Sequence, residues 1–287
     1  MKIANIALTH AGKFHADDVF SSAFLRIINP KIRIVRVTEV PEGFEGLVFD
    51  IGRGKFDHHQ TGAEVRANGV PYAAFGLLWR EYGRAFLEES GCPREDSAAE
   101  ASHFDDHFVQ PLDATDNTGC RCQLAEAVGA FNPVWDSDAK PDDCFEEAVS
   151  VGEKILRRQF AGILAEQRGR SLVREALSGE KDRVVVLPRF APWKSVLVPS
   201  DALFVVYPSK RGGFSAQAVT KALGSEEMKC PFPDAWAGKE NAELQKVSGI
   251  RSLRFCHKGR FLISADRKED ALKACRAAAE SMGKHPA

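Results

Sequence analysis

The first part of the chain alternates short apolar runs rich in β-branched residues with longer stretches of helical spacing. The expected strands are 3–9, 32–38 and 47–51, and the expected helices are 17–28, 72–89 and 95–109. Strands that alternate with helices are typical of a parallel sheet covered by helices. We therefore expect an α/β domain with a parallel sheet and helices on both of its faces.

The rest of the chain predicts a connecting helix and then a smaller domain. Apolar residues keep helical spacing from 142 to 177, and Pro and Gly become denser after Gly179. The expected strands there are 184–187, 203–207, 214–219, 253–257 and 261–264, with a closing helix at 269–281. We place the boundary near residue 180. The first domain then covers residues 1–180 with the connecting helix, and a smaller α/β domain covers residues 181–287.

The composition is that of a soluble globular protein. Of the 287 residues, 44% are hydrophobic and 28% are charged, which excludes a disordered, collagen-like or coiled-coil chain. No apolar run approaches the roughly 20 residues of a membrane helix, and the N-terminal segment is strand-like rather than a targeting peptide. Seven cysteines without a CxxC pair favour reduced thiols. We therefore expect a cytoplasmic protein without a membrane partner.

The charges are unevenly distributed along the chain. Residues 181–287 carry 19 Lys and Arg against 11 Asp and Glu, whereas residues 1–180 carry 20 against 29. Chance and solvated helix faces offer one explanation. The alternative is that the acidic part holds cations while the basic part holds a polyanion, and the positions of the histidines favour this alternative.

Six of the eight histidines lie in the first 107 residues, and four of them sit beside aspartates in two clusters. The clusters cover 10–18 and 50–60, after the first and third expected strands, where ligands bind in parallel sheets. A single such residue is usually a cap or a satisfied core group, but two clusters favour a site. Imidazoles with carboxylates suit Mn²⁺, Zn²⁺ or Fe²⁺, and two ions need a shared carboxylate. The candidates are His10, His15, Asp17, Asp50, Asp57, His58, His59 and Asp113.

An ordered set of motifs resembles the melanocyte-proliferating-gene family, a branch of the DHH phosphoesterases named for an Asp-His-His triplet. The motifs in the first part are Thr9-His10-x-Gly12-x-Phe14-His15-x-Asp17, Asp50-Ile-Gly, Asp57-His58-His59-Gln60 and Asp113-Ala-x-Asp116-Asn117. Those that follow are Asn132-Pro-x-Trp135, Pro192-Trp193-Lys194, Phe232-Pro-x-x-Trp236-x-Gly238 and Val247-Ser-Gly-Ile250. The resemblance implies a DHH-type domain with a dinuclear centre, usually of Mn²⁺, and a smaller domain that grips substrate phosphate.

The resemblance also implies roles for individual residues. His10 and His15 with Asp50 would hold one metal, and Asp17, Asp50, His58 and Asp113 would hold the other, with Asp50 bridging. Asp57 would orient a ligand histidine, and His59 would face the scissile phosphate. We therefore expect Asp57, His58 and His59 to be the catalytic residues. Mg²⁺, Zn²⁺ and Fe²⁺ remain alternatives to Mn²⁺, and a role for Asp116 as a ligand stays open.

The basic residues of the second part supply candidates for the phosphate grip, since arginine suits bidentate phosphate contacts. The set comprises Lys194, Lys210, Arg211, Arg254, His257, Lys258 and Arg260. Of these we select Lys194, Arg211, His257 and Arg260 as substrate-binding residues. Trp193, Phe214 and Trp236 are candidates for stacking on bases.

One rival pattern is a pair of histidines four residues apart, His103 and His107, which is the spacing of H-E-x-x-H zinc proteases. Phe104 stands where the catalytic glutamate would be. We therefore interpret both histidines as helix-surface residues.

The sequence thus predicts a metal-dependent phosphodiester hydrolase, a 3′→5′ exonuclease on RNA or short oligonucleotides. A small-molecule pyrophosphatase or nucleotide phosphatase with the same metal centre is the alternative, and a non-catalytic metal-binding protein is a third hypothesis. The partners expected are an RNA or oligonucleotide substrate and a second copy in a homodimer.

Overall fold

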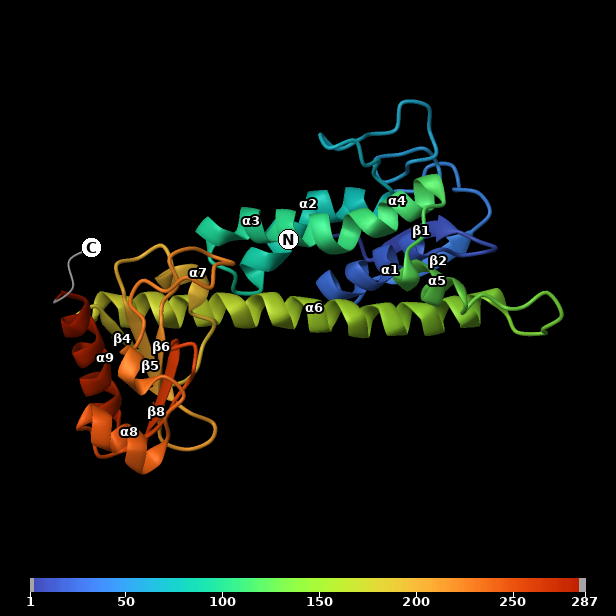
Figure 1. The fold of residues 1–287 in the computed structure, drawn as a ribbon. Helices are drawn as coiled ribbons and strands as arrows, with labels where there is room; N and C mark the ends of the chain where they lie inside the picture. The colour runs from blue at the N-terminus through green and yellow to red at the C-terminus, as the bar shows by residue number, and fades with distance from the viewer. Residues whose placement is uncertain (1–2, 284–287) are drawn as a thin grey trace. The chain divides into compact units, whose positions relative to one another are not determined.

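A computed structural model describes residues 3–283 of the chain (Figure 1). The chain forms two compact units, Met1–Leu164 and Ala165–Ala287. The division falls inside the long helix α6 (Pro141–Ser178), earlier than the boundary near residue 180 expected from the sequence. The reason is packing: Val173, near the end of α6, is fully buried in a core cluster of the second unit.

The first unit contains a three-stranded parallel sheet in the order β2-β1-β3. Its strands are β1 (Ile6–His10), β2 (Arg33–Val37) and β3 (Leu47–Val48). Leu8 pairs with residues of both neighbouring strands, so β1 is central and its carboxyl end at His10 lies between the ends of β2 and β3. Strand β3 is shorter than expected because Asp50, soon after it, adopts a left-handed conformation with φ of +56°.

Helices surround this sheet and supply most of the apolar core. They are α1 (Ala16–Ile28), α2 (Ala74–Glu89), α3 (Arg94–Phe104), the π-helix η1 (Asp105–Val109), α4 (Gln110–Thr118), α5 (Gln123–Gly129) and the first part of α6. In Figure 1, helices α2 to α4 lie on one side of α1 and the sheet, and α6 lies on the other. Aromatic rings join these layers: Phe24 of α1 contacts Phe75 and Trp79 of α2 and Phe160 of α6.

The second unit contains a mixed five-stranded sheet in the order β4-β5-β6-β8-β7. Its elements are β4 (Val184–Val186), α7 (Lys194–Leu197), β5 (Phe204–Pro208), β6 (Phe214–Ala218), η2 (Asp234–Trp236), α8 (Asn241–Ser248), β7 (Leu253–Cys256), β8 (Leu262–Ala265) and α9 (Lys268–Gly283). Alternate residues of β5 enter two different core clusters, because successive side chains of a strand point to opposite faces. The mixed α/β character expected from the sequence is thereby confirmed in both units.

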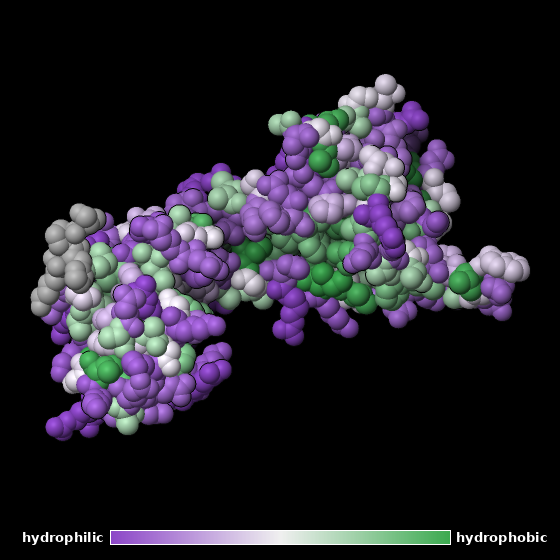
Figure 2. Space-filling model, viewed as in Figure 1, coloured by the Kyte–Doolittle hydropathy of each residue, from purple (hydrophilic) through white to green (hydrophobic). Residues whose placement is uncertain are grey.

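The visible surface is mostly hydrophilic, with smaller apolar areas (Figure 2). Every helix in the described part of the chain is too short or too polar to span a membrane.

Candidate metal centre

The ends of β1 and β3 bring the histidine and aspartate clusters of the sequence together. His10 is the last residue of β1, and α1 begins six residues later with two acidic residues in its first turn. After β3, the backbone N–H of Asp50 donates to the carbonyl of Phe56 at 2.9 Å. This short link places the triplet Asp57–His59 next to Asp50.

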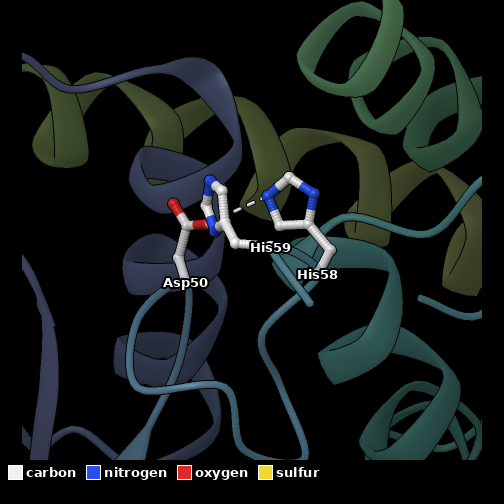
Figure 3. Close-up of side chains that lie close together, drawn as sticks. All are labelled: Asp50, His58 and His59. Atoms are coloured by element: carbon white, nitrogen blue, oxygen red, sulfur yellow. Dashed lines mark hydrogen bonds and ion pairs between the residues drawn. The ribbon is translucent and has the colours of Figure 1, made fainter. Parts of the chain in front are cut away.

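Asp50 is the point at which the clusters meet. Its Oδ2 lies 3.3 Å from Nε2 of His10, and its Oδ1 lies 3.1 Å from Nε2 of His58 and 3.6 Å from Nδ1 of His59. Figure 3 shows the rings of His58 and His59 beside the Asp50 carboxylate. Burial opposes the charge of Asp50, but the hydrogen bonds with His10 and His58 lower its pKa to about 2. Asp50 is thus a buried carboxylate shared among three imidazoles.

Further carboxylates surround this point. Oδ2 of Asp18 lies 3.2 Å from Nε2 of His10, and Oδ2 of Asp116 lies 3.1 Å from Nε2 of His58. Three groups of side chains could hold a metal ion. They are Asp50 with His58 and His59, His10 with Asp18 and Asp50, and Asp17 with His58 and Asp116.

Two observations show that the residues fit divalent cations. Nitrogen and oxygen ligands bind such ions at about 2.1 Å, which places neighbouring ligand atoms of one ion roughly 3.0–3.4 Å apart. The separations from His10 to Asp18 and to Asp50, 3.2 and 3.3 Å, match this spacing. In addition, the buried Oδ2 of Asp18 accepts no hydrogen bond within the described residues and faces Nε2 of His10 at 3.2 Å, so it is available to a cation that binds beside His10.

Asn117 sets the tautomer of His58. Its Nδ2 donates to the carbonyls of Tyr72 and Asp113, at 3.1 and 2.9 Å, so its Oδ1 faces Nδ1 of His58 at 3.1 Å as an acceptor. Without a metal, burial lowers the pKa of His58, but the hydrogen bonds of its Nε2 with Asp116 and Asp50 raise it to about 11, so Nε2 is protonated. With a metal bound, the neutral ring would keep its proton on Nδ1 and turn its Nε2 lone pair to the site, as in metal-bound histidines whose other nitrogen is held by a hydrogen bond.

The electrostatics of the site reflect an excess of buried negative charge. Burial, followed by repulsion from Asp50 and Asp116, raises the pKa of Asp17 well above its usual value. Burial likewise raises the pKa of Asp18 to about 7, against the attraction of His10. The hydrogen bond with Asp50 raises the pKa of His10 to about 9, although burial opposes this. Protonated imidazole therefore supplies positive charge in the position that a cation would take.

The amino end of α2 also stabilises the acidic site. Asp17 accepts the N–H groups of Ala74 and Phe75, at 3.0 and 2.8 Å, and Asp113 accepts that of Gly76 at 3.1 Å. Helix amino ends carry partial positive charge and unpaired N–H groups. A Cβ at Gly76 would lie 1.9 Å from Oδ2 of Asp113, so only glycine allows this approach.

The structure brings together most of the predicted metal ligands, namely His10, Asp17, Asp50 and His58. Asp113 was also predicted as a ligand, and whether it binds a metal stays a prediction. Its carboxylate is bound by Arg66 at 2.7 Å and by the amino end of α2, and it belongs to none of the three groups. Asp116, one turn further along α4, belongs to one of the three groups and lies 3.1 Å from Nε2 of His58.

The remaining predicted residues of this site lie at its edge. The half-exposed side chain of His15 lies 3.9 Å from Asp116 and is outside the three groups. Asp57 contacts His59, whose Nδ1 is 2.8 Å from the Asp57 carboxylate. Asp57 therefore orients the exposed histidine of the triplet rather than His58. The rings of His103 and His107 are neighbours on the surface, and these residues are in none of the candidate metal groups.

Two cavities give access to the cluster. One, of about 680 Å³, is lined by Asp17, His58 and Asp116 together with residues of α5. The other, of about 440 Å³, is lined by His10, Asp50 and Asp57. The side chains of His15 and His59 border both.

The four predicted phosphate-binding residues of the second unit lie at different places in the structure. Lys194 and His257 line the same cavity of about 930 Å³. Arg260 instead pairs with Asp234 at 2.7 Å, and Arg211 lies exposed in the turn between β5 and β6, outside that cavity. The four residues therefore do not form one cluster.

Sequence reasoning missed Asp18, Asn117, Arg36 and Arg66. Asp18 stands beside Asp17 in the first cluster, so a doubled aspartate at a helix start was the available signal. Asn117 lies inside a quoted motif but received no role. Arg36 and Arg66 contact residues that are distant in the sequence, and no motif around either arginine indicates these contacts.

Arg36 holds the loop that carries His10. Its guanidinium donates to the carbonyls of His10 and Gly12, at 3.2 and 2.6 Å, and pairs with Asp142 at 2.7 Å. It also lies over the rings of Phe14 and Phe145. These contacts need the planar fork of arginine, which lysine lacks.

We expect Arg36→Lys to weaken metal binding by about 10- to 100-fold, the range seen when a residue supporting a ligand is lost. Chelator competition would measure this. Arg33→Lys, an exposed change on the same strand, serves as the control. Equal affinity in both variants would contradict a positioning role for Arg36.

The fold and the site together define a mixed α/β protein with a buried carboxylate and imidazole centre that could hold a metal ion. A family model described as "Uncharacterised protein family (UPF0160)", with the short name MYG1_exonuc, matches residues 6–279. The chain therefore belongs to the MYG1 family, which confirms the resemblance stated from the motifs.

Named relatives agree with this assignment. "MYG1 exonuclease" of Rattus norvegicus is 30% identical over 94% of this chain and 83% of its own length. "MYG1 exonuclease" of Homo sapiens is 29% identical over 94% and 84%. "MYG1 protein" of Chlamydia pneumoniae is 28% identical over 99% of both chains. No solved structure matches the chain significantly.

Proposed function

We propose that the chain is a metal-dependent phosphodiester hydrolase that uses two divalent cations, with Mn²⁺ as the first candidate. We further propose that it is a 3′→5′ exonuclease on RNA or short oligonucleotides. The observation that carries the proposal is the convergence on Asp50 of the His10–Asp18 pair from one side and of the His58–Asp116 pair from the other. The printed names of the mammalian relatives support the exonuclease assignment.

In this mechanism His10, Asp18 and Asp50 would hold one cation, and Asp17, Asp50, His58 and Asp116 would hold the other. When bound, two such cations lower the pKa of a water nucleophile and neutralise charge on the phosphate. Asn117 keeps the Nε2 lone pair of His58 directed at the site. The amino end of α2 fixes the carboxylate of Asp17 through two N–H groups.

His59 would act on the substrate. Asp57 holds the ring at its Nδ1 edge, and the side chain is 58% exposed, which leaves Nε2 for a phosphoryl or leaving-group oxygen. Since His59 borders both cavities beside the cluster, a scissile phosphate at their junction would lie within its reach.

The test is hydrolysis of a 5′-labelled RNA 20-mer, with Mn²⁺, Mg²⁺, Zn²⁺ or a chelator present. We expect a ladder of products that shortens from the 3′ end, and no cleavage with the chelator. Pyrophosphate and a dinucleotide are the parallel substrates. Hydrolysis of pyrophosphate with intact RNA would favour the small-molecule phosphatase, and no hydrolysis of any substrate with metal bound would favour a non-catalytic protein.

A further inference from the structure

The loop between α5 and α6 carries a motif that none of the roles proposed for the metal centre uses. The motif covers residues 132–135, and its last residue, Trp135, is 96% exposed beside Val134, which is 66% exposed. In Figure 1 the loop extends beyond the amino end of α6. The other tryptophans of the chain are at most 4% exposed, namely Trp79, Trp193 and Trp236. Because one tryptophan buries a large area, this residue type is enriched at protein interfaces.

Hydrogen bonds hold this loop in a defined conformation. The backbone N–H of Phe14 donates to Oδ1 of Asn132 at 3.0 Å, and Nδ2 of Asn132 donates to the carbonyl of Phe14 at 2.8 Å. The N–H of Ser137 donates to the carbonyl of Val134 at 3.0 Å, which closes a turn around Trp135. The loop is therefore ordered before it meets a partner, and less conformational entropy is lost on binding.

The chain around Trp135 is acidic. Residues 130–143 contain four aspartates and one lysine. Asp142 pairs with Arg36 at 2.7 Å. The other three aspartates are exposed and form no ion pair within residues 3–283, namely Asp136, Asp138 and Asp143. These carboxylates would repel a nucleic-acid strand and attract a basic protein surface.

The second unit carries a basic turn that complements this loop. Lys210 and Arg211 lie between β5 and β6, and in the described part of the chain both are exposed and form no ion pair. The guanidinium of Arg254 donates to the carbonyl of Gly212 at 2.6 Å and holds the turn. The carboxylate of Asp266 pairs with Arg254 at 3.4 Å. The two cations at the tip of the turn are therefore available to an acidic partner.

We propose that the loop 133–138 of one copy of this chain docks on the turn 209–213 of a second copy. The guanidinium of Arg211 would lie on the face of the Trp135 ring, since arginine stacks well on tryptophan. Asp136 would then lie beside the ammonium of Lys210. Each copy offers one loop and one turn, so two reciprocal contacts close a dimer. Each contact is small, and we therefore expect a dimer that forms at micromolar concentration and dissociates on dilution.

The first test is sedimentation of the full chain over a range of concentrations. Trp135→Ala should weaken the dimer by roughly 30-fold or more, the effect of losing one aromatic anchor. Val65→Ala, at a valine that is 57% exposed, is the matched control and should change nothing. Salt should also weaken the dimer, because added ions screen the attraction between loop and turn. Trp135 is the exposed tryptophan of the chain, so acrylamide quenching of its fluorescence should fall as the dimer forms.

The second test exchanges the charges of loop and turn. One variant carries Asp136→Arg with Asp138→Arg, and the other carries Lys210→Asp with Arg211→Asp. Each variant alone should stay monomeric, because its loop and turn carry charges of the same sign. An equal mixture should form a heterodimer, since both contacts then pair opposite charges. Glu42→Arg, at an exposed glutamate of the first unit, is the control and should leave the wild-type dimer unchanged.

The proposal is overturned if the wild-type chain stays monomeric up to millimolar concentration, or if Trp135→Ala dimerises as strongly as wild type. It is equally overturned if the mixture of the two charge variants stays monomeric while wild type dimerises, because the loop and the turn would then not meet. Shielding of Trp135 by an added RNA oligonucleotide, in a protein that stays monomeric, would assign the loop to the substrate instead. None of these measurements depends on hydrolysis, so the result is independent of the proposed activity.

Discussion

Asp50→Asn should abolish hydrolysis and reduce the number of bound metal ions from two to one or none. The substitution keeps the shape of the side chain but removes the charge that His10 and His58 share. Two-metal centres supply several kcal/mol of transition-state stabilisation, so we expect a loss of turnover of about 10³-fold or more. Elemental analysis and the RNA assay would measure the two effects on the same preparation.

The matched control is Asp138→Asn, which removes one negative charge from an exposed loop residue. It should keep both metals and full activity. If Asp50→Asn instead retained two ions and turned over normally, the bridging role of Asp50 would be wrong.

Arg66→Met should lower the free energy of unfolding by about 3–5 kcal/mol, the usual cost of leaving a buried charge without its partner. The Arg66 side chain is 5% exposed and binds both Asp105 and the fully buried Asp113 at 2.7 Å. Burial raises the pKa of Asp113 to about 7, and attraction from Arg66 keeps this rise from being larger. Urea unfolding followed by circular dichroism, with a chelator present, would measure the loss.

Arg80→Met provides the comparison, because Arg80 forms an exposed pair with Glu64 and should cost at most about 1 kcal/mol. Adding Asp113→Asn to Arg66→Met removes the stranded charge and should restore part of the stability. An unchanged urea midpoint in Arg66→Met would show that this buried pair contributes nothing to the fold.

The sequence predicted most elements of the fold because their signals are local. The connecting helix expected at 142–177 is α6, and the five strands expected after residue 180 are β4 to β8, with their ends shifted by a residue or two. Two features were not predictable in this way. Strand β3 ends early at the left-handed Asp50, and the helix expected at 95–109 changes to a π-helix at Asp105.

The candidate site was predictable where motifs follow strand ends, as for His10, Asp50 and His58. The different contacts of Asp113 and Asp116 were not predictable, because both residues lie on α4 and only tertiary contacts separate them. Arg66, 47 residues earlier, donates to the carboxylate of Asp113 at 2.7 Å. In the second unit, Asp234 similarly neutralises Arg260, and a count of basic residues cannot reveal such pairs.

The close packing of aspartates around the end of β1 affects how long the folded protein survives in a cell. Asp17, Asp18 and Asp50 are almost completely buried within one small region. A ligand that binds only the folded state stabilises it by mass action, and small changes in stability alter how much of a protein survives chaperones and proteases. Under the proposed metal loading, scarcity of divalent cations would therefore shorten the survival of the chain itself, and the cellular abundance of this protein would follow the metal supply.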